Sequence, residues 1–156
     1  MPTKQIDQAG KCGGISLAEL LVVMAIISLA VMVAVPAIST AVRSARVRAA
    51  VDQYSVTLKA ARMVAVTNQA PCNVTVEIDP ANTYSYVDAQ GRTRRASMPP
   101  GVRILSSTSP IVFRSNGSVA GGAATRIETT IDERRTESWR IETNHLGITV
   151  VARDPA

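Results

Sequence analysis

Apolar side chains are concentrated in one uninterrupted stretch near the start of the chain. Between positions 15 and 38, 20 of 24 residues are Ala, Val, Ile, Leu or Met, and Glu19 is the only charged residue between Cys12 and Val42. A stretch of this length can cross a hydrocarbon core of about 30 Å as a helix. The sequence therefore predicts a membrane segment attached to a soluble domain.

After Pro36 the apolar pattern becomes one-sided. Apolar residues recur every three or four positions, the period of an amphipathic helix, at Val47, Val51, Tyr54, Leu58, Ala61 and Ala65. The spacing predicts one helix from about Leu17 to Thr67. A bend is expected at Pro36, because proline lacks an N–H and its ring clashes with the preceding turn. Asn68, Gln69 and Pro71 are expected to end the helix.

From Cys72 onward the chain alternates polar and apolar residues between turn signals, which is typical of short strands. The predicted strands cover 73–78, 83–87, 102–105, 111–114, 125–131, 138–142 and 148–152. Asn116-Gly117 is the most specific hairpin signal, and Phe113 and Trp139 are expected in the core. The predicted fold class is α+β: a long N-terminal helix packed on small antiparallel β-sheets.

The charge balance is moderately basic, with 17 Lys and Arg against 12 Asp and Glu and a net charge of +5. No basic run exceeds two residues, so a soluble surface with some anion affinity is favoured over dedicated nucleic-acid binding. The densest basic segment contains Arg92, Arg94 and Arg95 and is expected to form a loop. It is the candidate nucleic-acid contact, and a solvated hairpin tip is the alternative.

Catalytic and metal-binding motifs are absent from the sequence, including H-E-x-x-H, G-x-S-x-G, the Walker loop and paired cysteines. His145 is the only histidine and is expected to be a turn residue. Four acids surround a polar connection: Glu128, Asp132, Glu133 and Glu137. A solvated loop is the expectation there, and a calcium site is the alternative, which the lack of ordered acidic spacing disfavours. No enzyme activity, catalytic residue, cofactor or metal is therefore predicted.

The two cysteines, Cys12 and Cys72, do not form a disulfide framework. Cys12 precedes the apolar run, whereas an acylated lipoprotein cysteine follows one. Cys72 is expected to be a small buried residue of the soluble domain.

The residues before the apolar run differ from an ordinary secretory signal. Lys4 and Lys11 supply a basic start, but the small residues Gly13 and Gly14 precede the apolar run instead of following it. Cleavage after Gly14 would leave the apolar segment attached to the product. It would also create a free amino group on Ile15, one helical turn from Glu19, that could neutralise this acid in an apolar setting. Snorkelling of Glu19 to the membrane surface is the alternative.

The segment from Gly14 to Ile27 resembles the type III (prepilin) signal of type IV pilins and type II secretion pseudopilins, usually written G-F-T-L-x-E. The shared features are Gly14 before the cut, Glu19 as the fifth mature residue, the apolar run, and Pro36 as the twenty-second mature residue. Ile15 stands where the family usually has Phe. The resemblance implies cleavage between Gly14 and Ile15 by prepilin peptidase and N-methylation of Ile15. It also implies a cytoplasmic leader and a periplasmic C-terminal domain.

Later motifs are similar to the GspH/FimT group of minor pseudopilins and minor pilins. They are the segment from Pro110 to Gly122, which contains Phe113 and Gly117, and the segment from Trp139 to Gly147. The implied organisation is a leader peptide at 1–14, a transmembrane and assembly helix at 15–38, an amphipathic continuation at 39–68, and a β-rich periplasmic domain at 69–156.

Two functions follow as expectations from this resemblance. The first is a minor subunit of a type II secretion pseudopilus or a type IV pilus, anchored in the bacterial inner membrane. Its partners would be other pilins, prepilin peptidase and inner-membrane lipid. The alternative is a FimT-like minor pilin that binds extracellular DNA for uptake through basic loops. The final turn, Gly147-Ile148-Thr149-Val150, lacks the two arginines that the DNA-binding turn of that group would have. An enzyme or receptor domain on an uncleaved anchor is a third, generic possibility.

Overall fold

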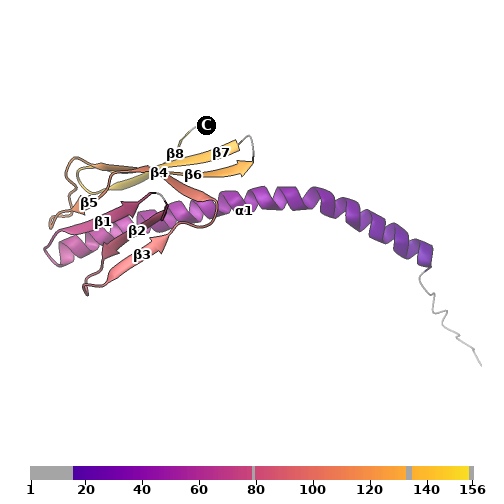
Figure 1. Cartoon of the computed structure of the whole chain (residues 1–156), viewed down its shortest axis with the longest axis horizontal. Coiled ribbons are helices and arrows are strands. Elements are labelled where there is room, and N and C mark those ends of the chain that lie inside the picture. The colour runs from indigo at the N-terminus through magenta and orange to yellow at the C-terminus, as the bar shows by residue number, and fades with distance from the viewer. Residues whose placement is uncertain (1–15, 79, 133–134, 155–156) are drawn as a thin grey trace, which may run out of the picture. The chain divides into compact units, whose positions relative to one another are not determined.

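The computed structural model describes residues 16–78, 80–132 and 135–154. Within these residues one long helix, α1 (Leu17–Thr67), precedes eight strands (Figure 1). The sequence predicts this helix and seven of the strands, and it misses the strand at Thr93–Ser97. The chain divides into two units, 1–38 and 39–156, and each is described by itself below. α1 continues through Pro36, and the bend expected there stays a prediction.

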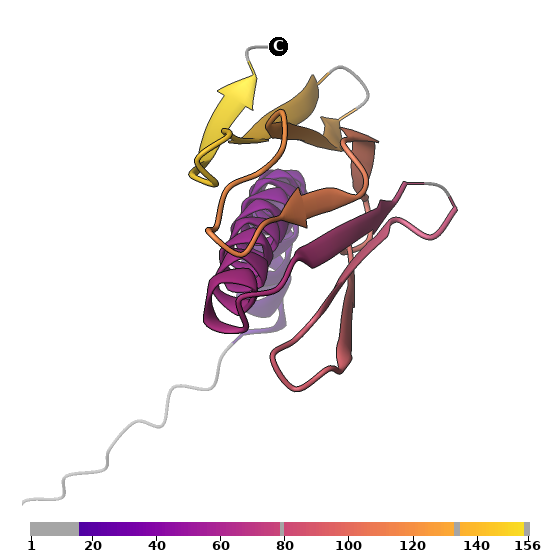
Figure 2. The same cartoon turned by 90° about the vertical axis from the view of Figure 1, so that its left-hand side faces the viewer.

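The eight strands form two antiparallel sheets in the second unit. They are β1 (Cys72–Glu77), β2 (Thr83–Val87), β3 (Thr93–Ser97), β4 (Val102–Ser107), β5 (Ile111–Phe113), β6 (Ala123–Asp132), β7 (Arg135–Thr143) and β8 (Thr149–Asp154). The first sheet has the order β3-β2-β1-β5 and the second β4-β6-β7-β8. Figure 2 looks along the helix and shows the two sheets on two adjacent sides of it.

The core of this unit lies where the helix meets the two sheets. All six apolar residues of the predicted stripe are buried, from Val47 to Ala65. Phe113 is buried as well, which confirms its expected place in the core. Trp139 is only half-buried against the core, and the Arg48 guanidinium lies 5.9 Å from its ring centroid. A cation over an aromatic face is attractive.

Tyr54 connects the helix to both sheets. Its ring packs edge-on against Tyr84 of β2, with centroids 5.0 Å apart and an interplanar angle of 85°. Its hydroxyl lies 3.0 Å from the Thr125 hydroxyl of β6, which in turn lies 2.8 Å from the Ser107 hydroxyl of β4. Burial raises the pKa of Tyr54, so the phenol stays neutral and hydrogen-bonded.

One expectation about the β region is wrong, and another is met only locally. The segment that contains Arg94 and Arg95 is not a loop but strand β3, which pairs with β2 from Val87↔Thr93 to Thr83↔Ser97. Asn116-Gly117 does form a tight turn, with Gly117 N–H donating to Arg114 at 2.8 Å. Phe113 and Val119 form an antiparallel bridge across this turn, so a minimal hairpin is present. The next strand, β6, nevertheless belongs to the other sheet, where it pairs with β4 and β7.

Asn82 ties the β1–β2 turn to the other sheet. Its side-chain amide donates to Val102 O at 2.7 Å and its amide oxygen accepts from Ile104 N–H at 2.9 Å. β4 is an edge strand, so two of its backbone groups have no neighbouring strand to bond. The Asn82 side chain satisfies both of them. The residue has a φ of 48°, which asparagine tolerates better than most residues.

Candidate assembly helix and basic strand

Large apolar side chains cover the first part of α1 on all sides. They remain exposed from Leu17 to Ile38, at 77% for Leu17 and 75% for Met32. This part of the helix is long and apolar enough to cross a membrane, and none of its most apolar window is buried inside the structure. Burying one such side chain contributes about 1.5–3 kcal/mol. An aqueous environment is therefore strongly unfavourable for it, and lipid or other apolar helices are the physical alternatives.

Glu19 lies in the first turn of α1 with an exposed side chain. Just before it, Ser16 accepts a hydrogen bond from Ala18 N–H through its hydroxyl at 3.2 Å. Ser16 therefore acts as the N-cap, a role we did not predict although Ser16-x-x-Glu19 is the spacing of a capping box. The carboxylate of Glu19 also complements the positive end of the helix dipole. Gly14 and Ile15, the expected cleavage site, lie outside the described residues.

The second candidate site is the basic segment around β3. Arg92 and Arg94 both donate through Nε to the same Asp88 oxygen, at 3.1 and 2.9 Å, and Arg95 lies 3.5 Å from Glu77. The arginine side chains stay exposed at 63%, 55% and 63%, in the same order. Each guanidinium is therefore already paired with a carboxylate, which reduces the positive charge available to a polyanion.

Asp88 organises this segment. The carboxylate also accepts the backbone N–H groups of Gln90 and Arg92, at 3.0 and 2.9 Å. Its side chain is only 9% exposed. These hydrogen bonds and the two arginines lower the pKa of Asp88 to about 2. The β2–β3 turn is thus built around an acid that is ionised at neutral pH.

Solved structures resemble the chain, although no family model and no curated protein sequence matches it. The minor pseudopilin EpsH from the Type 2 Secretion System of Vibrio cholerae has a TM-score of 0.54 at 14% identity, over 69% of this chain and 97% of that chain. The type IV minor pilin FimU of Pseudomonas aeruginosa (strain PAO1) has a TM-score of 0.51 at 15% identity, over 70% and 88% of the two chains. The chain has the minor pilin fold. This confirms the α+β architecture expected from the GspH/FimT resemblance.

In this example of the minor pilin fold, Gly117 and Gly147 allow α1, the Asn116-Gly117 turn and the β7–β8 turn to pack closely together. Arg62 of α1 donates through Nε to Gly117 O at 3.1 Å. Gly147, in the β7–β8 turn, has a φ of 75°, and a Cβ there would overlap Gly117 O and crowd the Arg62 side chain. The turn at the position where DNA-binding relatives of this group would carry two arginines thus packs closely against Gly117 and Arg62.

The other candidate residues have structural roles in this minor pilin fold. His145 lies in a turn, as expected, and its backbone oxygen accepts Val119 N–H at 3.0 Å. Cys72 is buried, as expected, and burial raises its thiol pKa. Glu137 was expected in a solvated connection, which is wrong, because it lies on β7 at 6% exposure. Arg153 and the Ser44 hydroxyl donate to Glu137, with Arg153 at 2.6 Å.

The remaining acids of the expected polar connection also belong to the strands. Glu128 and Asp132 lie on β6, and Glu133 lies outside the described residues. Within the described chain, His, Cys, Asp and Glu form no group that could hold a metal ion.

Proposed function

We propose that this chain is a minor pseudopilin or minor pilin subunit that joins a type II secretion pseudopilus or a type IV pilus. The observation that carries the proposal is the exposed apolar surface from Leu17 to Ile38 on a chain with the minor pilin fold. EpsH and FimU are a pseudopilin and a pilin by name. An apolar helix of this kind can reside in a bilayer before assembly and pack against neighbouring helices afterwards.

In this proposal, prepilin peptidase cuts between Gly14 and Ile15 and methylates the new amino terminus of Ile15. The mature chain is held in the inner membrane with the β-rich unit in the periplasm. Glu19 then sets the register between subunits, because an acid among apolar helices is penalised unless it meets an amino terminus. Pro36 bends the helix between its membrane part and its amphipathic part.

Three variants of the helix start test the role of Glu19. Glu19→Gln removes the charge while keeping the size and the hydrogen-bonding capacity of a capping-box residue. Glu19→Ala removes both, and Ser16→Ala weakens the cap while keeping the charge. We expect all three to enter the membrane fraction, and only the two Glu19 variants to lose co-purification with other pilus subunits.

Equal incorporation of Glu19→Gln and the unmodified chain would refute the register role. Loss of incorporation in Ser16→Ala alone would assign the effect to helix capping instead. N-terminal sequencing of the mature chain tests processing separately. An N-terminus at Ile15 supports prepilin cleavage, whereas an N-terminus near residue 1 supports an uncleaved anchor.

DNA binding through Arg92, Arg94 and Arg95 is the alternative function. The pairing of these arginines with Asp88 and Glu77 argues against it. An electrophoretic shift of duplex DNA by the full chain in detergent, at low and moderate salt, tests it. The structural proposal requires no shift at either salt concentration.

A further inference from the structure

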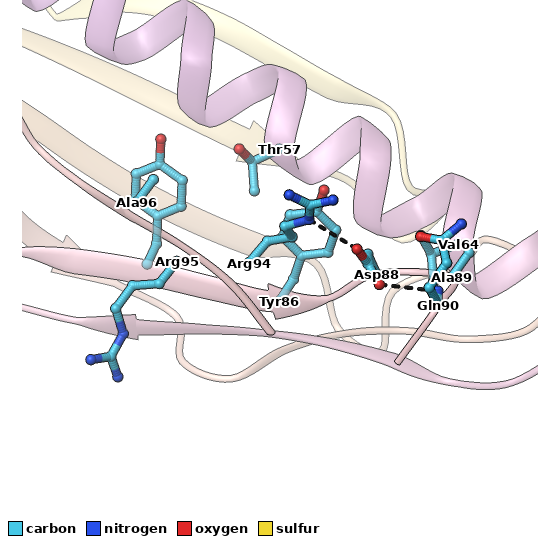
Figure 3. Close-up of a pocket in the computed structure, with 10 residues that line it drawn as sticks. Thr57, Val64, Tyr86, Asp88, Ala89, Gln90, Arg94, Arg95 and Ala96 are labelled. Atoms are coloured by element: carbon cyan, nitrogen blue, oxygen red, sulfur yellow. Dashed lines mark hydrogen bonds and ion pairs between the residues drawn. The ribbon is translucent and has the colours of Figure 1, made fainter. Parts of the chain in front are cut away.

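A groove of about 440 Å³ runs between α1 and the free edge of the first sheet. Its walls come from the helix, from β2 and from β3 (Figure 3), and they include Thr57, Val64, Tyr84, Tyr86, Arg94 and Ala96. The volume lies within the usual range of about 300–1,000 Å³ for binding pockets. The lining also includes Asp88, which is bonded to Arg94, and Arg95, whose side chain points away from α1 (Figure 3). The walls thus combine apolar and aromatic surface with the Arg94 guanidinium, so the groove suits a partner with both an apolar and an acidic group.

The guanidinium of Arg94 is held in this groove through Nε alone. Its Nε donates to Asp88 at 2.9 Å (Figure 3). Within the described chain, its two terminal nitrogens have no hydrogen-bond partner. A guanidinium can donate two parallel hydrogen bonds to one carboxylate, and fixing its orientation in advance lowers the entropy lost on binding. Arg95, the next residue, points away from α1 in the same view.

The backbone of β3 offers a second set of contacts. β3 is the edge strand of its sheet. Asp88 N–H donates to Arg92 O and Met98 N–H donates to Asn82 O, which fixes the alternation of the β2–β3 ladder. By this alternation, the N–H and C=O groups of Thr93, Arg95 and Ser97 face the open edge. Such an edge is a template for an added strand.

We propose that an extended acidic segment of a partner protein pairs with the edge of β3 and places one carboxylate on the terminal nitrogens of Arg94. The side chain two positions further along that segment would lie on the same face, beside Ala96 and Val64, and would be apolar. This assignment goes beyond pilus membership, because it names a recognition site on the β-rich unit that does not require the apolar helix to assemble.

Charge favours a peptide over nucleic acid as the occupant. Three arginines face two carboxylates in this segment, Asp88 and Glu77, which leaves a surplus of one positive charge. A single surplus charge suits one carboxylate and releases few counterions from a phosphate backbone. The free backbone groups of β3 match another strand and have no counterpart in DNA.

The binding test uses the full chain in detergent and fluorescein-labelled peptides read by fluorescence anisotropy. The probe is a short peptide with the repeat Glu-Ser-Val-Ser, which places a carboxylate and an apolar side chain two positions apart on one face of the strand, and its matched control has Gln in place of Glu. We expect the Glu peptide to bind about tenfold more tightly than the Gln peptide, since a hydrogen bond between charged groups is stronger than a neutral one. A duplex DNA oligonucleotide with the same fluorescein label is the third probe.

Two variants examine the two halves of the site. Arg94→Gln should weaken binding of the Glu peptide about tenfold, while Arg95→Gln, on the other face, should change it less than threefold. Ser97→Pro removes an N–H that faces the edge and leaves the β2 ladder intact, so it should weaken both peptides equally. Unchanged Trp139 fluorescence shows that each variant is folded.

The proposal is overturned by equal binding of the Glu and Gln peptides, or by an equal effect of the Arg94 and Arg95 variants. Binding of DNA but not of the Glu peptide would likewise overturn it and would favour the nucleic-acid alternative. If Ser97→Pro binds both peptides as well as the unmodified chain, strand addition is excluded.

Discussion

Replacing Asn82 by alanine should strongly destabilise the β-rich unit. The change removes the hydrogen bonds to Val102 O at 2.7 Å and from Ile104 N–H at 2.9 Å. Each contributes about 1 kcal/mol, because water can reach part of this strand edge after the change. Alanine at a φ of 48° adds a further conformational cost of about 1 kcal/mol. The expected loss is therefore about 3 kcal/mol.

Trp139 makes this loss measurable in the full chain. It is the only tryptophan and belongs to β7, so its emission during urea unfolding in detergent micelles follows the β-rich unit and not the apolar helix. The free energy of unfolding comes from linear extrapolation to zero urea. The same titration applies to every variant.

Two further variants divide the effect. Asn82→Asp keeps an acceptor for Ile104 N–H but turns a carboxylate oxygen toward Val102 O, so it should lose about 2 kcal/mol. Asn116→Ala is the matched control, because Asn116 bonds only within its own exposed turn, to Ser118, and should lose less than about 1 kcal/mol. If Asn82→Ala loses no more than Asn116→Ala, the link between the sheets is not a stabilising contact.

Three further outcomes are expected. Gly147→Ala should destabilise the chain by more than about 3 kcal/mol, whereas Gly91→Ala, at a similar φ but in open space, should lose only about 1–2 kcal/mol; equal losses in urea titrations would contradict the close junction. Because the pKa of Asp88 is lowered to about 2 in the fold, its ionised carboxylate stabilises the fold above about pH 4, and this stabilisation is lost as pH falls toward about 2. Acid unfolding followed by Trp139 emission should show this pH-dependent loss in the unmodified chain and not in Asp88→Asn. Cys72 should react with a maleimide only after urea unfolding, because its thiol is buried with a raised pKa.

The helix was predictable because its period is a local property of the sequence. All six stripe residues are buried in the structure, since a 3.6-residue repeat places them on one face whatever they contact. The N-cap at Ser16 was also encoded locally, by serine three positions before Glu19, although we did not predict it.

Strand β3 could not be predicted in the same way. Thr-Arg-Arg-Ala-Ser contains little apolar alternation, and all but Ala96 are exposed. What makes it a strand is pairing with β2 and a turn organised by Asp88, and neither is visible in the segment itself. The basic site was thus found by composition, while its neutralisation by Asp88 and Glu77 depends on tertiary contacts.

Glu137 and the Asn116-Gly117 turn show the same limit. The Glu137 carboxylate is buried because Ser44 and Arg153, distant in sequence, converge on it. The Asn-Gly signal correctly predicts a tight turn, but a two-residue signal cannot specify which sheet the following strand joins.

The contacts of Tyr54 determine how the β-rich unit would bear mechanical load. The two sheets are separate hydrogen-bonded ladders, and Tyr54 touches one through its ring and the other through its hydroxyl. A force that pulls this part of the helix along its axis would act on both sheets at the same time. The side chains between the helix and the sheets would have to slide past one another. Resistance to extraction force would then depend on the helix–sheet interface as a whole, and the strands would stay intact until that interface slips.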